Sequence, residues 1–358
     1  MELHTGRIGR LRALLREAQA DAFISAFGPH LRYFAGFSGS NGMIVITQRS
    51  ALFFTDFRYK EQSASEVPAF RRTVVRGSLI EAAAKGGAFK GLGTIVFNEE
   101  VCSYKFIDEL RAQAREASIR PGSLIAERCM TCKDEGEIAD LAAAAAISDR
   151  VFTDLLTLIR PGITELDIAA EIVSRHRRYG AEKDAFDVIA ASGPNSSLPH
   201  ARPTARAVAS GDFITLDFGC VFRGYHSDMT RTIAVGRASA AMKKVYAAVL
   251  EAQKTGVRAA RPGITGRQLD ASARRVIARH GYGKYFLHGL GHGIGLQIHE
   301  EPRVSKTNNQ PLPEGAVITI EPGIYLSGQF GVRIEDDVVL RNGGCEVITA
   351  SPKELIIL

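Results

Sequence analysis

The sequence lacks several features that mark common classes of protein. It contains no Trp, and its five cysteines are an odd and sparse set for 358 residues. A disulfide framework needs paired cysteines, so we expect reduced thiols and a cytoplasmic protein. No run of about 18 or more apolar residues occurs, so we expect no membrane-spanning helix. The opening residues carry scattered arginines without an apolar block and a cleavage site, so we expect no secretory signal.

Charge and cysteine spacing give only weak signals. The net charge is +6, and basic clusters such as Arg175–Arg178 lie in helix-like segments, where solvated outer faces explain them. Nucleic-acid binding would need basic residues interleaved with stacking aromatics, which are missing, so we expect no such partner. Cys129 and Cys132 have CxxC spacing, but no second pair or nearby histidine completes a zinc site. We interpret them as a chance pair in a linker.

The first part of the chain alternates between helix-like and strand-like segments. Apolar residues recur at helical spacing over residues 8–20. Short strand-like runs follow at residues 22–26, 43–46, 51–54 and 94–97. This alternation predicts an α/β domain with a mostly buried sheet.

The pattern changes between residues 121 and 133, after which a long helical segment begins. Helices are predicted at residues 134–159, 164–179, 238–256 and 265–280, with strands between and after them. Segregated helices and antiparallel hairpins predict an α+β fold. We therefore predict an N-terminal domain over residues 1–128 and a second, larger domain over residues 133–358.

Two aspartates lie in the first hairpin of the second domain. Strand-like segments flank Phe222–Gly224, which reads as a tight turn. A register centred between residues 222 and 223 makes Asp217 and Asp228 direct cross-strand neighbours on one face. A bulge at Gly224 would shift this register. Two ionised aspartates so placed are destabilising unless one is protonated or a cation lies between them.

A second hairpin carries two glutamates. Glu321 closes a strongly apolar strand, and Glu335 follows Ile334 in the next strand-like segment. A glutamate attached to a buried strand needs a partner. Asp336 and Asp337 are expected to be solvated or capping residues, although one of them could orient a ligand.

A glycine-rich segment, His288–Gly295, lies between the hairpins. Its four alternating glycines make a helix unfavourable. In an extended chain the two histidines of this segment, with Leu290 and Ile294, would face the same side. The run is not a dinucleotide-binding motif, and Arg303 stands where an HExxH zinc motif beginning at His299 needs histidine.

These motifs together resemble the dinuclear Xaa-Pro peptidases, aminopeptidase P and prolidase, a family with the pita-bread fold. The matching segments are Leu216–Gly219, Ser227–Arg231, His288–Gly295, His299–Glu300, Ile320–Gly323 and Val332–Asp336. Segments Tyr33–Gly42 and Phe54–Tyr59 resemble the N-terminal domain of the family. The resemblance covers nearly the whole chain and implies a pita-bread catalytic domain preceded by a smaller α/β domain.

The resemblance implies two divalent metal ions per subunit. Asp217 would bind one ion, His292 and Glu321 the other, and Asp228 and Glu335 would bridge them. Carboxylates with a single imidazole suit Mn²⁺, or alternatively Co²⁺ or Zn²⁺. Such ions activate water and polarise the scissile carbonyl group.

The resemblance also implies roles for histidines outside the metal ligands. Glu321 would be the general base that takes the proton of the attacking water. His299 matches the histidine that stabilises the tetrahedral intermediate. His288 and His200 match histidines on the substrate side.

Further residues are predicted to contact the substrate. Tyr225 and Tyr325 are candidates for the proline pocket, with a structural hydroxyl as the alternative for each. Arg333 resembles an arginine that orients the metal-binding carboxylates. Arg303 is placed to bind the free carboxylate that a dipeptidase must recognise, although related aminopeptidases can carry a basic residue there.

The predicted activity is hydrolysis of the bond before proline in peptides. The stretch Gly36–Gly42 resembles aminopeptidase P, so Xaa-Pro aminopeptidase is our main prediction and Xaa-Pro dipeptidase (prolidase) the alternative. Methionine aminopeptidase is disfavoured by the N-terminal domain, and creatinase by the intact ligand set. A non-catalytic pita-bread binding module is a remoter alternative. The resemblance also implies a homodimer.

Overall fold

The computed structural model describes residues 2–358 and divides into two compact units, Met1–Met130 and Thr131–Leu358. The division lies inside the stretch where the sequence pattern changes. Each unit contains its own cluster of buried hydrophobic side chains. Among the described helices, none combines the length and the apolar composition needed to cross a membrane.

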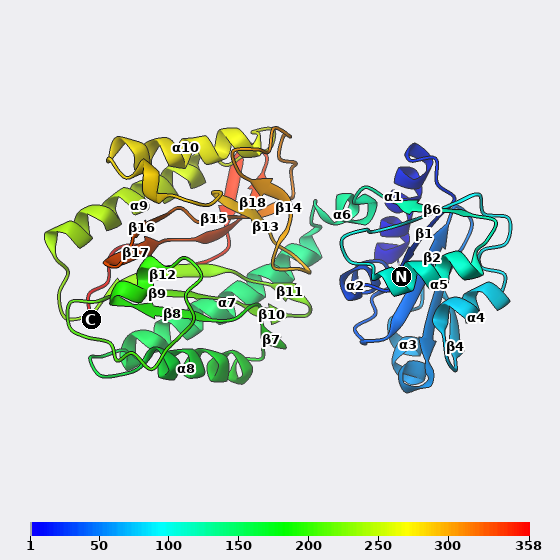
Figure 1. Cartoon of the computed structure of the whole chain (residues 1–358), viewed down its shortest axis with the longest axis horizontal. Helices are drawn as coiled ribbons and strands as arrows, with labels where there is room; N and C mark the ends of the chain where they lie inside the picture. Colours follow the sequence, from blue (N-terminus) through cyan, green and yellow to red (C-terminus); the bar gives the residue numbers. More distant parts are fainter. Residues whose placement is uncertain (1) are drawn as a thin grey trace. The chain divides into compact units, whose positions relative to one another are not determined.

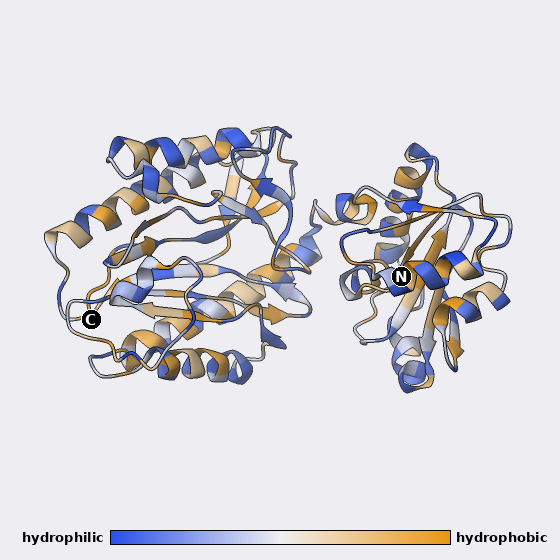
Figure 2. Cartoon of the chain, in the orientation of Figure 1, coloured by the Kyte–Doolittle hydropathy of each residue, from blue (hydrophilic) through white to orange (hydrophobic). Residues whose placement is uncertain are grey.

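The first unit is an α/β domain around one six-stranded sheet. The strand order is β4-β3-β2-β1-β5-β6, and only the pairs β1–β2 and β2–β3 are antiparallel. The strands are β1 (Ala22–Ser25), β2 (Gly42–Thr47), β3 (Ala51–Asp56), β4 (Arg71–Val75), β5 (Thr94–Phe97) and β6 (Ser118–Pro121). Its central strands are hydrophobic in Figure 2 and buried, as predicted for a sheet covered on both faces.

Six helices precede, connect or follow these strands in the described residues. They are α1 (Glu2–Glu17), α2 (Gly28–Ala35), α3 (Lys60–Glu66), α4 (Leu79–Lys85), α5 (Tyr104–Gln113) and α6 (Ile125–Met130), with a 3₁₀ turn at Phe57–Tyr59. The strands predicted at residues 22–26, 43–46, 51–54 and 94–97 are confirmed, whereas β4 and β6 were not predicted. Both missed strands lie at sheet edges and contain no fully buried residue, so the sequence gives them no buried hydrophobic run.

Four long helices frame the second unit. They are α7 (Glu135–Leu158), α8 (Glu165–Arg178), α9 (Ala240–Ala259) and α10 (Gly266–Arg279), and all four match the predicted segments. Capping boxes begin three of them, with Asp134, Thr164 and Thr265 as the capping residues. Figure 1 shows α7 and α8 along one side of the strands and α9 and α10 along the other.

The strands between these helices form antiparallel sheets, which confirms the predicted α+β class. One sheet has the order β12-β9-β8 and another the order β14-β13-β15-β18-β19, with smaller sheets β11-β10-β7 and β16-β17. The first set is β7 (Lys183–Asp184), β8 (Ile189–Ser192), β9 (Phe213–Phe218), β10 (Cys220–Phe222), β11 (Tyr225–His226) and β12 (Met229–Ala234). The second set is β13 (Gly291–Gly293), β14 (Glu300–Val304), β15 (Val317–Ile320), β16 (Gly323–Leu326), β17 (Phe330–Arg333), β18 (Asp336–Arg341) and β19 (Gly344–Val347). Two 3₁₀ turns, Gly193–Ser197 and Gly283–Tyr285, complete the unit.

The predicted register of the first hairpin is wrong by two residues, although the two strands pair as expected. The tight turn consists of Arg223 and Gly224, both with positive φ, so its centre lies one position later than expected. Asp217 therefore pairs with Thr230. The same register places Asp228 diagonal to Asp217, which still leaves the two aspartates on one face of the ribbon.

The second hairpin changes sheet at its glutamates. β15 pairs with β18 up to Ile320 and Asp336, and β16 pairs with β17 from Gly323 and Arg333 onward. The register carried across this break places Glu321 opposite Glu335. Neither glutamate belongs to a strand, so both side chains project from the gap between two sheets.

Candidate metal and peptide site

The five predicted metal ligands all line one cavity of about 790 Å³. They are Asp217, Asp228, His292, Glu321 and Glu335. The cavity size is typical of sites for small ligands. The two hairpins and the glycine-rich segment thus converge on one place, as the sequence predicted.

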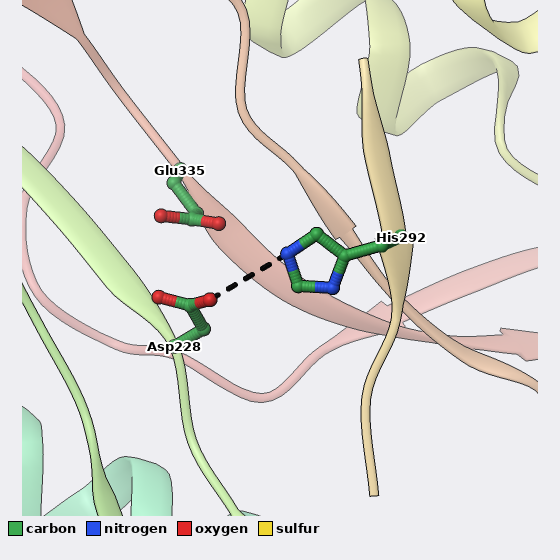
Figure 3. A group of neighbouring side chains, drawn as sticks. All are labelled: Asp228, His292 and Glu335. Carbon is green, nitrogen blue, oxygen red and sulfur yellow. Dashed lines mark ion pairs between the residues drawn. The ribbon is translucent and has the colours of Figure 1, made fainter. Parts of the chain in front are cut away.

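Three of these residues form the tightest group. Asp228, His292 and Glu335 each offer a ligand atom, and these atoms lie within 4.8 Å of one another. The three side chains point toward one another in Figure 3. His292 Nε2 is 3.7 Å from Asp228 Oδ2 and 3.5 Å from Glu321 Oε1. Asp217 borders the same space but lies outside the tightest group.

The hydrogen bonding of His292 leaves one nitrogen free for a cation. Its Nδ1 lies 3.1 Å from the carbonyl oxygen of Gly293, an acceptor that requires the proton to be on Nδ1. Burial lowers the pKa of His292 to about 3, so the ring is neutral. The Nε2 lone pair therefore faces the carboxylate oxygens of Asp228 and Glu321, a repulsive arrangement unless a cation lies between them.

Burial and mutual repulsion both disfavour the charged forms of the carboxylates in this site. Burial raises the pKa of Asp228 and of Glu335 well above their usual values, and neighbouring carboxylates raise both further. Burial likewise raises the pKa of Glu321 to about 8. Acidic groups held so close favour protonation unless positive charge is supplied.

The residues fit divalent metal ions. The Oδ1 atoms of Asp217 and Asp228 are buried and have no hydrogen-bond partner within the described part of the chain. Buried polar atoms are normally satisfied, so two orphaned carboxylate oxygens facing one cavity indicate a missing partner. Carboxylate oxygens with one imidazole nitrogen and no thiolate match Mn²⁺, Co²⁺ or Zn²⁺.

Two threonines that the sequence prediction missed hold the glutamates. Thr230 donates a hydrogen bond to Glu335 Oε2 at 2.6 Å, and Thr319 donates to Glu321 Oε1 at 3.3 Å. Thr319 also accepts the backbone N–H of His292. A period-two signal was present, because Thr319 lies two residues before Glu321 at the end of a segment that was predicted to be extended.

Asp336 and Asp337 are fully buried, so their predicted solvation is wrong. Asp337 Oδ2 accepts the backbone N–H of Asp228 at 2.9 Å, which agrees with the expectation that one of the pair orients a candidate ligand. Asp336 accepts hydrogen bonds from the buried Arg231 and from Gln253. The apolar strand β18 carries both carboxylates into the interior, where each meets donors.

Arg333 connects the ligands to the cavity wall. Its guanidinium donates to Asp217, to the hydroxyl of Tyr325 at 2.6 Å and to Thr230 at 3.0 Å. It also donates to the backbone oxygen of Pro199 at 3.2 Å. This geometry agrees with the predicted carboxylate-orienting role, and it uses the planar donor array that only arginine has.

Three further histidines line the cavity, His200, His288 and His299. The ring of His299 packs edge-on against His292 at 4.4 Å between centroids. His288 Nδ1 lies 2.8 Å from the oxygen of Gly289, which leaves Nε2 to accept from the Tyr325 hydroxyl at 3.1 Å. Burial lowers the pKa of His288 to about 4, so this ring is neutral as well.

The predicted one-sided arrangement of the glycine-rich segment is wrong in part. Only Gly291–Gly293 forms a strand, and its pairing is irregular. Leu290 packs in the hydrophobic core, whereas His288 and His292 line the cavity. The glycines serve close packing: a Cβ on Gly291 would lie 2.0 Å from the backbone oxygen of Thr319.

Tyr225 does not line the cavity, so its predicted substrate contact is a misplacement. Its buried hydroxyl donates to Glu137 Oε1 on α7 at 3.0 Å, which matches the structural alternative. Tyr325 does line the cavity. Arg303 lines it too, with a mostly exposed side chain 3.9 Å from Glu301, and Arg202 is an exposed lining cation that the sequence prediction missed.

Comparison with known proteins gives two family matches. Residues 139–342 match metallopeptidase family M24, and residues 7–129 match the creatinase/prolidase N-terminal domain. The chain is 37% identical over 361 residues to the Xaa-Pro dipeptidase of Pyrococcus horikoshii, covering 99% of this chain and 100% of that protein.

Solved structures give the same picture. An Xaa-Pro dipeptidase from Bacillus anthracis superposes with a TM-score of 0.96 at 41% identity, over 99% of this chain and 100% of that one. An X-Pro aminopeptidase from Thermotoga maritima MSB8 superposes with a TM-score of 0.90 at 39% identity, over 97% and 100%. These similarities confirm the predicted pita-bread domain with a smaller N-terminal α/β domain.

Proposed function

We propose that this chain, which belongs to metallopeptidase family M24, is an Xaa-Pro dipeptidase that hydrolyses the bond preceding proline in dipeptides. Relatives named as Xaa-Pro dipeptidases match the chain over nearly its whole length. They favour this activity over the Xaa-Pro aminopeptidase that was our main prediction from the sequence. The observation that carries the proposal is the buried carboxylate and histidine cluster, which opens into a cavity lined by further histidines and three arginines.

Two divalent ions would occupy the cluster. We assign Asp217 to one ion, His292 and Glu321 to the other, and Asp228 and Glu335 to both, with Mn²⁺ as the expected metal. When bound, the ions supply positive charge that acidifies the attacking water and polarises the carbonyl group of the scissile bond. Membership in metallopeptidase family M24 implies the use of divalent metal.

The chain's own residues then position the substrate and move the proton. We assign Glu321 as the general base, since it lines the cavity and its Oε1 lies 3.5 Å from His292 Nε2. His299, beside His292 on the cavity wall, is placed to donate to the oxyanion that develops on the substrate carbonyl. The Tyr325 hydroxyl, fixed between Arg333 and His288, borders the space for the proline ring.

A cation near the site would account for the dipeptide preference that we propose. A dipeptide presents its free carboxylate one residue beyond the cut, and a guanidinium binds such a group in bidentate fashion. Arg303 lines the same cavity as His292 and His299. Burial lowers the pKa of both histidines, and the charge of Arg303 lowers it further. We assign Arg303 to that carboxylate. A second candidate function, Xaa-Pro aminopeptidase, is favoured by the similarity to the Thermotoga maritima structure.

Substrate length is tested with matched peptides. Metal-free protein is reloaded with Mn²⁺ and given Ala-Pro, Ala-Pro amide, Ala-Pro-Gly and Ala-Ala. Cleavage of Ala-Pro with little cleavage of Ala-Pro amide and of Ala-Pro-Gly supports the dipeptidase. In that case Arg303→Gln should raise KM for Ala-Pro, whose free carboxylate Arg303 binds, and leave KM for Ala-Pro amide unchanged. Efficient cleavage of Ala-Pro-Gly would instead establish the aminopeptidase. Light scattering of the same preparation tests the homodimer, which we also propose.

A further inference from the structure

A fully buried carboxylate outside the cavity contacts the segment that carries His200. Glu165, the first residue of α8, has no exposed surface. It does not line the cavity and is not one of the proposed ligands. A buried carboxylate is costly unless it is well hydrogen-bonded, so its partners show what it stabilises.

The partners of Glu165 lie at the two ends of one loop. We define the His200 loop as residues 192–204. Oε1 accepts the backbone N–H of Ser192 at 2.6 Å and its hydroxyl at 2.8 Å. Oε2 accepts the backbone N–H of Thr204 at 3.0 Å and its hydroxyl at 2.7 Å. The amide of Asn195 donates to both oxygens at 3.1 Å.

The start of α8 adds backbone contacts to the same loop end. The N–H of Glu165 donates to the oxygen of Arg206 at 3.1 Å, and the N–H of Leu166 donates to the oxygen of Thr204 at 3.1 Å. These are the N–H groups that the first turn of a helix leaves unpaired. The side chain and the helix start therefore join the two ends of the loop.

Between these ends the loop reaches the cavity. Pro199, His200 and Arg202 line it, and the ring of His200 is exposed. Because few neighbouring side chains surround an exposed residue, the position of its ring is set mainly by the backbone that carries it. That backbone has a second anchor, because Arg333 donates to the oxygen of Pro199 immediately before His200.

We propose that Glu165 is a positioning residue for the peptidase reaction, acting through the His200 loop, an inference that rests on the proposed function. Each carboxylate oxygen accepts a backbone N–H and a hydroxyl group. A glutamine would place its NH₂ group, which is a donor, against one of these N–H groups in either orientation, so it cannot replace the carboxylate. Glu165→Gln therefore frees one end of the loop while leaving the metal ligands untouched. Displacement of a positioning group by about 1 Å is enough to lower a rate substantially.

The test is a double-mutant cycle with His200. Glu165→Gln should lower kcat/KM for Ala-Pro about 10- to 100-fold. In the His200→Ala background the same substitution should cost less than about 3-fold, because the residue through which it acts is gone. An equal loss in both backgrounds would overturn the proposal. Thr204→Val, which removes one donor, should give a smaller loss in the same direction even if Glu165→Gln folds poorly.

A matched control and a second measurement separate this inference from the proposed function. Glu171→Gln makes the same chemical change on another face of α8, at an ion pair with Arg175, and should leave kcat/KM unchanged. Hydrogen exchange should accelerate at residues 192–204 in Glu165→Gln, with Mn²⁺ affinity unchanged. If the wild type cleaves no Xaa-Pro peptide, the proposed function fails, and the exchange data still decide whether Glu165 fixes the loop. Unchanged exchange there would contradict the inference.

Discussion

Glu321 and Glu335 lie opposite each other at the point where one hairpin passes from one sheet to another. The strand pairs on either side of this break keep the same register, so the two glutamates occupy opposed positions although neither belongs to a strand. Like charges at directly opposed positions destabilise a hairpin. The fold tolerates the pair because each glutamate accepts a threonine hydroxyl, from Thr319 and Thr230, and, in our account, because metal ions supply the opposite charge.

Asp228→Asn should change stability in opposite directions with and without metal. In metal-free protein at pH 8, removal of a buried acid with a raised pKa should raise Tm by a few °C, on the order of 1–2 kcal/mol. With Mn²⁺ the variant should lose most of the metal-induced rise in Tm, and kcat/KM should fall more than about 100-fold. Calorimetry in chelator and in Mn²⁺ measures both. A variant destabilised equally in the two conditions would contradict the assignment of Asp228 to the metal ions.

Arg333→Lys should lower kcat/KM about 10- to 100-fold although the charge is kept. Lysine offers one nitrogen where Arg333 uses three to reach Asp217, Tyr325 and Thr230. Arg341→Lys, at a partly exposed ion pair, is the control and should change kcat/KM by less than about 2-fold. Equal effects of the two substitutions would show that the donor geometry of Arg333 is unimportant.

The two tyrosines separate a structural hydroxyl from a site hydroxyl. Tyr225→Phe removes the bond to Glu137 and should cost about 1 kcal/mol of stability with KM for Ala-Pro unchanged. Tyr325→Phe removes the hydroxyl that contacts His288 and Arg333 in the cavity, and it should lower kcat/KM about 10-fold. Steady-state kinetics and thermal unfolding of both variants give the comparison. A raised KM for Tyr225→Phe would restore its predicted place at the substrate.

Metal-free protein should lose stability as the pH rises from 6.5 to 8. Burial raises the pKa of Glu321 from 4.5 to about 8, so its stabilising contribution is complete below pH 4.5 and is lost as the pH rises toward 8. His292, whose pKa is lowered from 6.5 to about 3, adds no slope above pH 6.5, since it is neutral there in both states. Tm measured in chelator should therefore fall across this window, and Glu321→Gln should flatten the fall. A Tm independent of pH would contradict the buried-acid description.

The sequence predicted the large elements of the fold because their signals are local. The four helices of the second unit begin at capping residues and follow regular apolar spacing, and the central strands of the first unit are continuous apolar runs. The edge strands β4 and β6 were missed because they pair through their backbones and bury little side chain.

The candidate ligands and the supporting Arg333 could be named from the sequence, but most of the other groups that hold the carboxylates could not. The register error in the first hairpin came from the turn, where Arg223 adopts a positive φ. Such a φ is uncommon for arginine, so the sequence does not predict it. A charged residue such as Asp337 is expected at the surface from the sequence alone. In the structure its strand is buried, and its side chain accepts the backbone N–H of Asp228. Glu165 lies far along the chain from the loop that it joins, so only the tertiary structure relates them.

Titration of metal-free protein with Mn²⁺ tests the central claim most directly. Hydrolysis of Ala-Pro and bound metal are followed together as Mn²⁺ is added to chelated, dialysed protein. The account predicts no hydrolysis without metal, restoration of activity as the sites fill, and saturation near two ions per subunit in the wild type but not in Asp228→Asn. Full hydrolysis of Ala-Pro by the metal-free protein, unchanged by Mn²⁺ or by Asp228→Asn, would contradict it.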